Sequence, residues 1–354
     1  MAQPLGLDSE IVGLSPFVVQ DNPLQSELIH AFPAKGPSSY RYSPDLLRWC
    51  RDNLNRFDGV MLHGSWSHAN WTVSRECLIV GIPYIAFPHG MLDLWSVRGQ
   101  GWVKRLKKEL YWHYREKYIM EKSCAIFFTL ARELENTRLT FVLPEVARMI
   151  VVPYGVSMGC ETEEMPASVT VRQTPGVKIA LFLGRIHPKK RPDLLMHAWK
   201  DACLGPEWRL IVAGPGEPTY LAHLEGLAHE CGIKSAVQFT GPVAGADKRY
   251  LLHRAEWFLL PSEQENFGIA VLEAADAGCA IAISDQVYLA DEFPPGSEIL
   301  PVQTEVWSRF MRERMTDDVW RNETARRVQE QLRRKFGAEA VRLGWVNSIT
   351  QALQ

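Results

Sequence analysis

The sequence predicts an α/β protein with two doubly wound parallel sheets, each covered by helices on both faces. Short apolar runs alternate with segments of helical periodicity along nearly the whole chain, which is typical of parallel sheets. The length of 354 residues is long for one α/β domain and comfortable for two, and 46% of the residues are hydrophobic. Two sizeable cores are therefore expected.

Four strands are expected in the first half, where apolar runs are bounded by turn-forming residues. They span residues 59–63, 82–87, 125–129 and 149–152. The apolar periodicity between them predicts helices over residues 68–79, 102–120 and 130–140.

The second half repeats this alternation with five expected strands. They span residues 178–183, 209–213, 237–240, 257–260 and 280–284. Helices are expected between them near residues 190–202, 219–231, 245–254 and 267–277.

A polar segment between the halves marks the domain boundary. Residues 155–176 contain three glutamates and two prolines and show no apolar periodicity, which is typical of a linker. We expect one domain over residues 1–157 and a second over residues 158–335. The last residues, 336–354, are expected to form a closing helix that packs back across the boundary.

Composition narrows the kind of partner and the compartment. The net charge of −2 argues against nucleic acid as the principal partner, because neutralising a phosphate backbone requires a basic face. Seven cysteines are scattered without a Cys-x-x-Cys motif, and an odd count without a signal peptide indicates a reducing compartment, most simply the cytoplasm. The uncharged run Cys77–Met91 is too short and too interrupted to span a membrane.

Two glutamates flank an expected helix start after the strand at 257–260. Glu265 lies just before the helix and Glu273 lies roughly 10 Å further along its axis. Asn266 is expected to cap the helix and leave the amides of residues 267–269 facing an anion or hydroxyl. Carboxylates accept paired hydroxyl groups, so this spacing suits a sugar nucleotide. The alternative is that both are ordinary helix residues, one of them facing the helix dipole.

Two cations follow the first strand of the second half. Four residues separate Arg185 from Lys190, so a short turn can bring a guanidinium and an ammonium onto one diphosphate. Cations at a helix N-terminus oppose the dipole, so the cluster formed by Lys189, Lys190 and Arg191 indicates an anionic ligand. A solvated helix start is the alternative explanation for Lys189 and Arg191.

These motifs resemble the family 4 retaining glycosyltransferases of GT-B architecture, also called group 1 glycosyltransferases. Their Arg-x4-Lys, Gly-x-Gly and Glu-x7-Glu elements occur here in order and spacing, and the resemblance covers most of the chain. Further similar pieces are Pro88–Leu92, Phe128-Thr129 with Glu133, Val152–Val156 and Phe239–Gly241. The resemblance implies two Rossmann-like domains that face each other across a cleft, with an acceptor-side first domain and a nucleotide-sugar-binding second domain.

The resemblance also implies an activity: transfer of a hexose from a nucleoside diphosphate sugar to a saccharide or lipid-linked saccharide, with retention of anomeric configuration, in polysaccharide or glycolipid biosynthesis. The catalytic residues that it implies are Arg185, Lys190, Glu265 and His89. The donor-binding residues that it implies are Gly184, Gly214, Gly216, Thr240, Gly241, Asn266, Phe267, Gly268, Ile269 and Glu273.

Among the ten histidines, His89 is singled out because it ends an apolar strand in Pro-His-Gly. Its expected role is hydrogen bonding to the transferred sugar, and a capped loop histidine is the alternative. His63 has the same strand-end position, and we expect a structural or acceptor-side role for it. No metal or other cofactor is expected, because Arg185 and Lys190 can neutralise the leaving diphosphate and no Asp-x-Asp motif is present.

The N-terminus departs from the family pattern. Residues 1–12 resemble the helix end and strand that normally follow the first strand and glycine-rich loop, so that first strand is expected to be absent. This departure leaves a non-catalytic partner subunit as one alternative function. A GT-B epimerase or phosphorylase is the other.

Residues 102–118 combine basic and aromatic side chains on a helical period. Such a helix can lie on an anionic membrane and give peripheral contact with its inner surface. The alternative is a surface helix whose aromatic side chains pack inward while its lysines stay in water.

Overall fold

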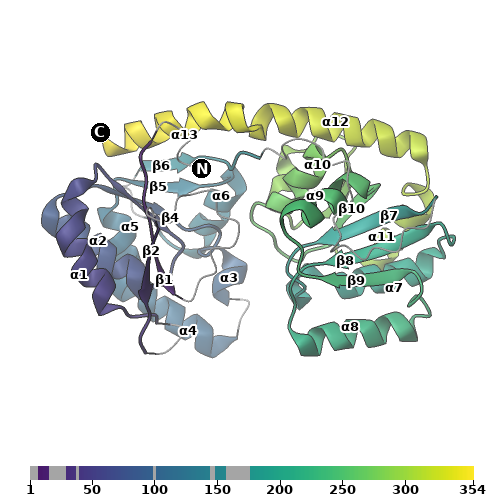
Figure 1. Ribbon diagram of the computed structural model, residues 1–354, viewed down its shortest axis with the longest axis horizontal. Coiled ribbons are helices and arrows are strands. Elements are labelled where there is room, and N and C mark those ends of the chain that lie inside the picture. The colour runs from purple at the N-terminus through teal and green to yellow at the C-terminus, as the bar shows by residue number, and fades with distance from the viewer. Residues whose placement is uncertain (1–6, 16–28, 37–39, 99–100, 144–147, 157–175) are drawn as a thin grey trace. The chain divides into compact units, whose positions relative to one another are not determined.

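The computed structural model describes residues 7–15, 29–36, 40–98, 101–143, 148–156 and 176–354, and the chain divides into two compact units (Figure 1). Unit 1 consists of Met1–Pro153 together with Val341–Gln354, and unit 2 consists of Tyr154–Ala340. Most of the expected linker, residues 157–175, lies outside the described residues.

Unit 1 contains a four-stranded parallel sheet in the order β3-β4-β5-β6 and a separate parallel pair, β1-β2. The strands are β1 (Ile11–Ser15), β2 (Ile29–Pro33), β3 (Val60–His63), β4 (Tyr84–Phe87), β5 (Ala125–Phe128) and β6 (Arg148–Val151). Every residue of β4 and β5 is buried, as expected for central strands that are covered on both faces.

The helices of unit 1 separate these strands. They are α1 (Pro44–Asn53), η3 (Leu54–Arg56), α2 (His68–Val80), α3 (Leu94–Arg98), α4 (Trp102–Tyr111), the π-turn η4 (Trp112–Glu116), α5 (Lys117–Lys122) and α6 (Ala131–Thr140). Serine side chains cap α1 and α2: Ser43 accepts from the Leu46 amide and Ser67 from the Ala69 amide.

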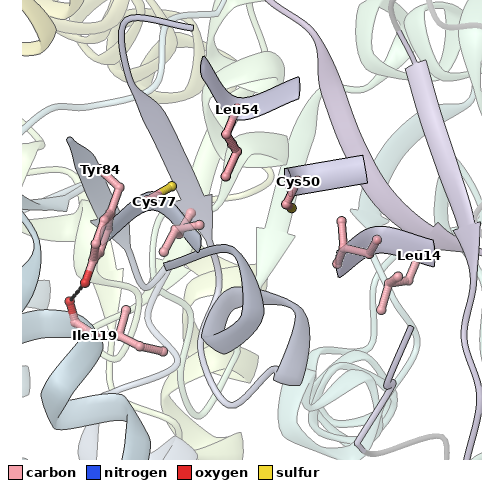
Figure 2. Packing of buried hydrophobic residues seen from close by; sticks show 8 residues of the cluster. Leu14, Cys50, Leu54, Cys77, Tyr84 and Ile119 are labelled. Carbon is pink, nitrogen blue, oxygen red and sulfur yellow. Dashed lines mark hydrogen bonds between the residues drawn. The ribbon is translucent and has the colours of Figure 1, made fainter. Parts of the chain in front are cut away.

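One core cluster of unit 1 joins β1 to the larger sheet, and Figure 2 shows its packing. Leu14 of β1 packs in this cluster with Cys50 of α1 and Cys77 of α2. The hydroxyl of Tyr84 donates to the Ile119 carbonyl at 2.8 Å, which satisfies a polar group in an apolar site. Burial raises the pKa of Cys50 and Cys77 to about 12, so both thiols stay protonated and act as apolar core groups.

Unit 2 is built on a six-stranded, wholly parallel sheet in the order β12-β11-β10-β7-β8-β9. Its strands are β7 (Lys178–Leu183), β8 (Trp208–Ala213), β9 (Val237–Gly241), β10 (Trp257–Leu260), β11 (Ala280–Ser284) and β12 (Glu298–Leu300). The helices are η5 (Pro188–Lys190), α7 (Pro192–Ala202), α8 (Pro218–Glu230), α9 (Gly245–Arg254), α10 (Ile269–Asp276), η6 (Tyr288–Glu292), α11 (Thr304–Glu313) and α12 (Asp318–Phe336).

Strand order reverses between β7 and β10. From β7 the chain moves outward through β8 to β9, then returns to the other side of β7 and continues through β10 to β12. The loops that follow β7 and β10 therefore leave the sheet in opposite directions, and such a switch point is where open parallel sheets bind ligands.

The last helix, α13 (Ala338–Leu353), begins in unit 2 and continues in unit 1. Within unit 1, the indole Nε1 of Trp345 donates to the Pro153 carbonyl at 2.7 Å, and its ring lies 5.7 Å from that of Phe87. The end of the chain thus contributes side chains to the unit that the first half builds.

The structure confirms the predicted α/β fold class, and a strand occurs at each of the nine expected places. The expected helix 102–120 is corrected, because a π-turn at 112–116 divides it. The helix expected at 267–277 begins at Ile269, and the one expected at 190–202 begins at Pro192 after a 3-10 turn. Several elements were not predicted: β1, β2, β12, α1, α11 and α12.

Candidate functional site

Glycines end three adjacent strands of unit 2. Gly184, Gly214 and Gly241 stand at the carboxyl ends of β7, β8 and β9, and backbone bonds join them in a row: Gly184 N donates to Ala213 O at 3.0 Å and Gly214 N to Gly241 O at 2.8 Å. A Cβ atom on Gly214 would lie 1.9 Å from the Gly184 carbonyl oxygen. No larger residue fits there, because the backbones of these two strand ends approach each other closely.

The loops after β7 and β8 continue side by side. Ile186 N donates to Pro215 O at 2.7 Å, and a Cβ atom on Gly216 would lie 2.9 Å from the Ile186 Cβ. The second glycine of the Gly-x-Gly element therefore serves close packing of two loops. Thr240, next to Gly241, is half-buried and donates its hydroxyl to the Gly241 carbonyl at 3.0 Å.

The turn that carries Lys190 is bound to the loop after β10. The Glu263 amide and the Ser262 hydroxyl both donate to the Lys189 carbonyl, at 2.8 and 3.3 Å. Arg191 donates to the Glu263 carboxylate at 3.1 Å. These contacts connect the two loops of the switch point, although the segments lie more than 70 residues apart in sequence.

Lys190 and Glu265, both predicted from sequence, form an ion pair there. Both side chains are largely buried, with exposed fractions of 14% and 23%. Glu265 is held through its backbone, since its amide donates to Gln286 O at 3.2 Å and its carbonyl accepts from the Tyr288 amide at 3.0 Å. The carboxylate is thus presented from a fixed backbone.

Burial, and after it the positive charges of Lys189 and Arg185, lower the pKa of Lys190 to about 7. The carboxylate of Glu265 opposes this shift by favouring the ammonium. Arg185 is exposed, and after desolvation its charge is the second cause that lowers the pKa of His187. The structure therefore gathers a concentration of positive charge at the end of β7, where an anion would relieve the repulsion.

The start of α10 corrects one expectation. Gly268, in the left-handed conformation at φ 71°, is the N-cap residue, and Asn266 is not. Phe267 is buried with its ring 5.1 Å from Tyr154, so it anchors the loop. Three amides were expected at the start of this helix. The amide of Ile269 lies in its first turn, and the amides of Phe267 and Gly268 precede the helix.

Glu273, inside α10, makes an ion pair that sequence reasoning missed. Lys248 of α9 donates to its Oε1 at 2.6 Å. Its Oε2 is buried and has no hydrogen-bond partner among the residues described. A buried acceptor without a donor is costly, so this oxygen is suited to a hydroxyl group of a ligand.

In unit 1, His63 ends β3, His89 lies two residues after the end of β4, and the two side chains contact each other. His63 Nδ1 lies 2.8 Å from His89 Nε2, and the ring planes differ by 6°. Although His63 is exposed at the surface of the unit, desolvation by the surrounding protein lowers the pKa of both rings. The pKa of His89 falls to about 4, with His63 as the second cause. Both rings are therefore neutral at pH 7, and one donates to the other.

Two residues of these sites, Lys248 and Glu133, had no role assigned from the sequence. No local sequence pattern marks Lys248, because its partner Glu273 lies 25 residues away on another helix. Glu133 was noted within a motif without a role, and the structure buries its carboxylate against the His89 loop. Elsewhere in the described ranges, no three His, Cys, Asp or Glu side chains gather as a metal site requires.

Solved structures with this fold include HepE from Anabaena in complex with UDP and glucose, at a TM-score of 0.74 and 13% identity over 97% of this chain and 100% of that one. WaaG, a glycosyltransferase involved in lipopolysaccharide biosynthesis, matches at a TM-score of 0.72 and 17% identity over 99% of this chain and 94% of that one. The fold is that of the GT-B glycosyltransferases.

Residues 169–297 match the family described as "Glycosyl transferases group 1". The D-inositol 3-phosphate glycosyltransferase of Xylanimonas cellulosilytica is 30% identical over 182 residues, which are 47% of this chain and 42% of that protein. The D-inositol 3-phosphate glycosyltransferase of Mycobacterium ulcerans is 32% identical over 140 residues, which are 38% of this chain and 30% of that protein. The chain therefore spans less than half the length of these curated relatives.

Proposed function

We propose that this protein is a retaining glycosyltransferase that moves a hexose from a nucleoside diphosphate sugar to a saccharide or lipid-linked saccharide, in polysaccharide or glycolipid biosynthesis. The observation that carries the proposal is the Lys190–Glu265 pair at the switch point of unit 2. It sets a cation for diphosphate beside a carboxylate for hydroxyl groups, in the unit whose strands β7, β8 and β9 end in glycines.

Arg185 and Lys190 bind the diphosphate and stabilise the charge that grows on it as the glycosidic bond breaks. Lys190 can do so while it contacts Glu265, because an ammonium has three donors. The positive field of these side chains takes the role that a divalent cation has in other transferases, so no metal is required.

The carboxylates bind the two ends of the donor. Glu265 holds hydroxyl groups of the hexose, assisted by amides around the start of α10. Glu273 holds the ribose through Oε2, and the nucleobase contacts the backbone near Thr240 and Gly241. His89 donates a hydrogen bond to the transferred sugar, and the leaving group departs on the acceptor's face, which retains configuration without a protein nucleophile.

Calorimetry with a panel of UDP, GDP and ADP sugars tests the proposal most directly. UDP-glucose is the first donor to try, because solved relatives of the fold hold UDP and UDP-glucose. We expect one donor to bind in the presence of EDTA and to release nucleoside diphosphate only when an acceptor is added. Absence of binding to every donor would favour a partner subunit, and turnover without acceptor would favour an epimerase.

Steady-state kinetics separate the roles of the diphosphate and ribose contacts. Arg185→Ala should mainly depress kcat, because its contact strengthens as charge develops, whereas Glu273→Ala should mainly raise the donor KM. Arg254→Ala, at an exposed position of α9, is the control and should change neither. The reverse pattern would contradict the assignments.

We also propose peripheral contact with the inner surface of the cytoplasmic membrane through residues 102–118. No residue of α4 is buried. Trp102, Leu106, Leu110 and Tyr114 recur every four residues with exposed fractions of 77%, 50%, 50% and 75%, and basic side chains flank this apolar row. An exposed row of this kind fits an anionic interface. Trp112, at 6%, packs inward. Of the helices that the structure describes, none has the length and hydrophobicity needed to cross a bilayer.

Co-sedimentation with vesicles tests the contact. The double variant Trp102→Ser with Leu106→Ser should bind phosphatidylglycerol vesicles at least tenfold more weakly, since each lost apolar side chain is worth about 1.5–3 kcal/mol. Leu139→Ser, at a 73% exposed position of α6, should bind like the wild type. Equal binding by the double variant, or no wild-type preference for anionic over neutral vesicles, would refute the contact.

A further inference from the structure

Glu133 is a carboxylate with no solvent exposure that bridges two loops of unit 1. It lies in the first turn of α6, and its Oε2 accepts from the Thr129 amide at 2.7 Å and the Thr129 hydroxyl at 2.6 Å. Its Oε1 accepts from the Gly90 amide at 2.5 Å, across 43 residues of sequence. Burying a carboxylate is expensive unless several donors compensate it, and here three do.

The loop that Glu133 contacts has an unusual backbone. His89 adopts φ 54° and Gly90 φ 72°. The left-handed region costs a non-glycine residue roughly 1 kcal/mol or more. The Gly90 amide bond to Glu133 lies directly after the strained residue and can hold it in this conformation.

This conformation places the His89 ring against defined neighbours. Its centroid lies 4.0 Å from that of Phe87, and its Nε2 meets His63 Nδ1. The geometry therefore links a buried carboxylate on α6 to the direction of an imidazole that follows β4.

The contacts with Thr129 have a simpler purpose, because an acidic side chain at the third position of a helix commonly caps its start. That purpose does not explain the Gly90 contact, which reaches the loop of a different strand. The two roles can be tested separately, since the Thr129 contacts are with Oε2 of Glu133 and the Gly90 contact is with Oε1.

We propose that Glu133 is a positioning residue for sugar transfer, which fixes the Pro88–Met91 loop and with it the direction of the His89 ring. The inference rests on the proposed function, yet its central measurement needs no turnover. The side chain of Glu133 remains buried throughout and takes no part in the chemistry.

The experiment compares Glu133→Gln with Thr129→Val, which removes one cap contact and leaves the Gly90 contact. NMR of 15N-histidine protein should show the pKa of His89 rising from about 4 by one or more units in Glu133→Gln and unchanged in Thr129→Val. In kinetics, Glu133→Gln should lower kcat at least tenfold and change the donor KM less than twofold. In a double-mutant cycle, adding Glu133→Gln to the His89→Ala variant should lower kcat by less than a further twofold.

Additive losses in that cycle, or a His89 titration that Glu133→Gln does not move, would overturn the proposal. If Glu133→Gln fails to fold, the wild-type Gly90 amide provides the test: it should be protected from hydrogen exchange, and exchange at the rate of an open loop would refute the role. A wrong proposed function gives a different result. The wild type would then bind no sugar nucleotide, while the pKa of His89 would still respond to Glu133→Gln as expected.

Discussion

Lys190 is a lysine whose charge depends on its surroundings. Its ammonium is buried beside Lys189 and Arg185, so its pKa falls to about 7, and the group loses its proton as pH rises through that value. A diphosphate bound next to it favours the ammonium and raises the pKa again. The free and donor-bound forms should therefore titrate at different pH values.

The pH profile should show this difference. In the wild type, kcat/KM for the donor should fall about tenfold per pH unit above pH 7, because this ratio reports the free enzyme, while the fall in kcat begins at higher pH. Lys190→Arg should remove the alkaline fall from kcat/KM, since a guanidinium keeps its charge. A wild-type kcat/KM that stays flat from pH 6 to 9 would contradict the role of Lys190.

At the scale of elements, the π-turn in the helical segment after Gly101 decides what is buried. No side chain of α4 is buried, yet Trp112 and Glu116 of the turn are. The inserted residue changes the helical phase and points these two side chains inward. Glu116 then accepts from the Trp66 amide at 3.1 Å, and burial raises its pKa to about 7.

This shift makes a stability prediction for Glu116→Gln. The pKa of Glu116 in the folded protein is about 7, above the usual 4.5. Between pH 4.5 and 7 the folded state therefore binds more protons than the unfolded state. The stability that protonated Glu116 contributes is lost as pH rises through 7. At pH 8 the variant should be more stable than the wild type by up to about 3 kcal/mol, and at pH 4.5 by much less. Urea unfolding at both pH values measures the difference.

Glu121→Gln, at a half-buried position of α5 whose carboxylate pairs with Lys117 at 3.4 Å, is the control and should show no such pH-dependent gain. The comparison must be a difference between variant and wild type, because His63 and His89 have lowered pKa values and contribute stability in the opposite sense. An equal gain at both pH values would mean that Glu116 is ionised throughout.

Elements were predictable where one local pattern sufficed. The strands of the central sheets are continuous apolar runs, which sequence reveals without knowledge of partners. Strands β1 and β2 have few buried residues, and α12 is mostly polar, so their patterns are weak. The start of α10 was misplaced because Asn266 is a good capping residue, and only the left-handed Gly268 decides where the helix begins.

At the scale of the molecule, the chain end stabilises the unit in which the chain began. Trp345 is 7% exposed and packs on Phe87 and Phe127 of the unit 1 sheet. Trp345→Ala should destabilise unit 1 by about 3–5 kcal/mol, as for other large core truncations. Hydrogen exchange should show faster exchange in β4 and β5 and unchanged protection in β7 and β8.

Leu343→Ala is the matched control, because Leu343 lies on the same helix and is 57% exposed. It should leave exchange in both units unchanged. Equal loss of protection in unit 2 after Trp345→Ala would contradict the assignment of this side chain to the unit 1 core.

The sequence by itself determined the fold class and the order of the central strands along the chain. It also identified candidate residues such as Arg185 and Glu273. These results follow because apolar runs and short spacings are local properties of a sequence. Tertiary structure alone decided which of these residues meet. The Lys190–Glu265 pair, the Lys248 contact to Glu273 and the Glu133 contact to Gly90 join segments 25 to 75 residues apart. Such contacts exist because parallel strands bring their carboxyl ends to one edge of a sheet, and burial there lowers the pKa of Lys190.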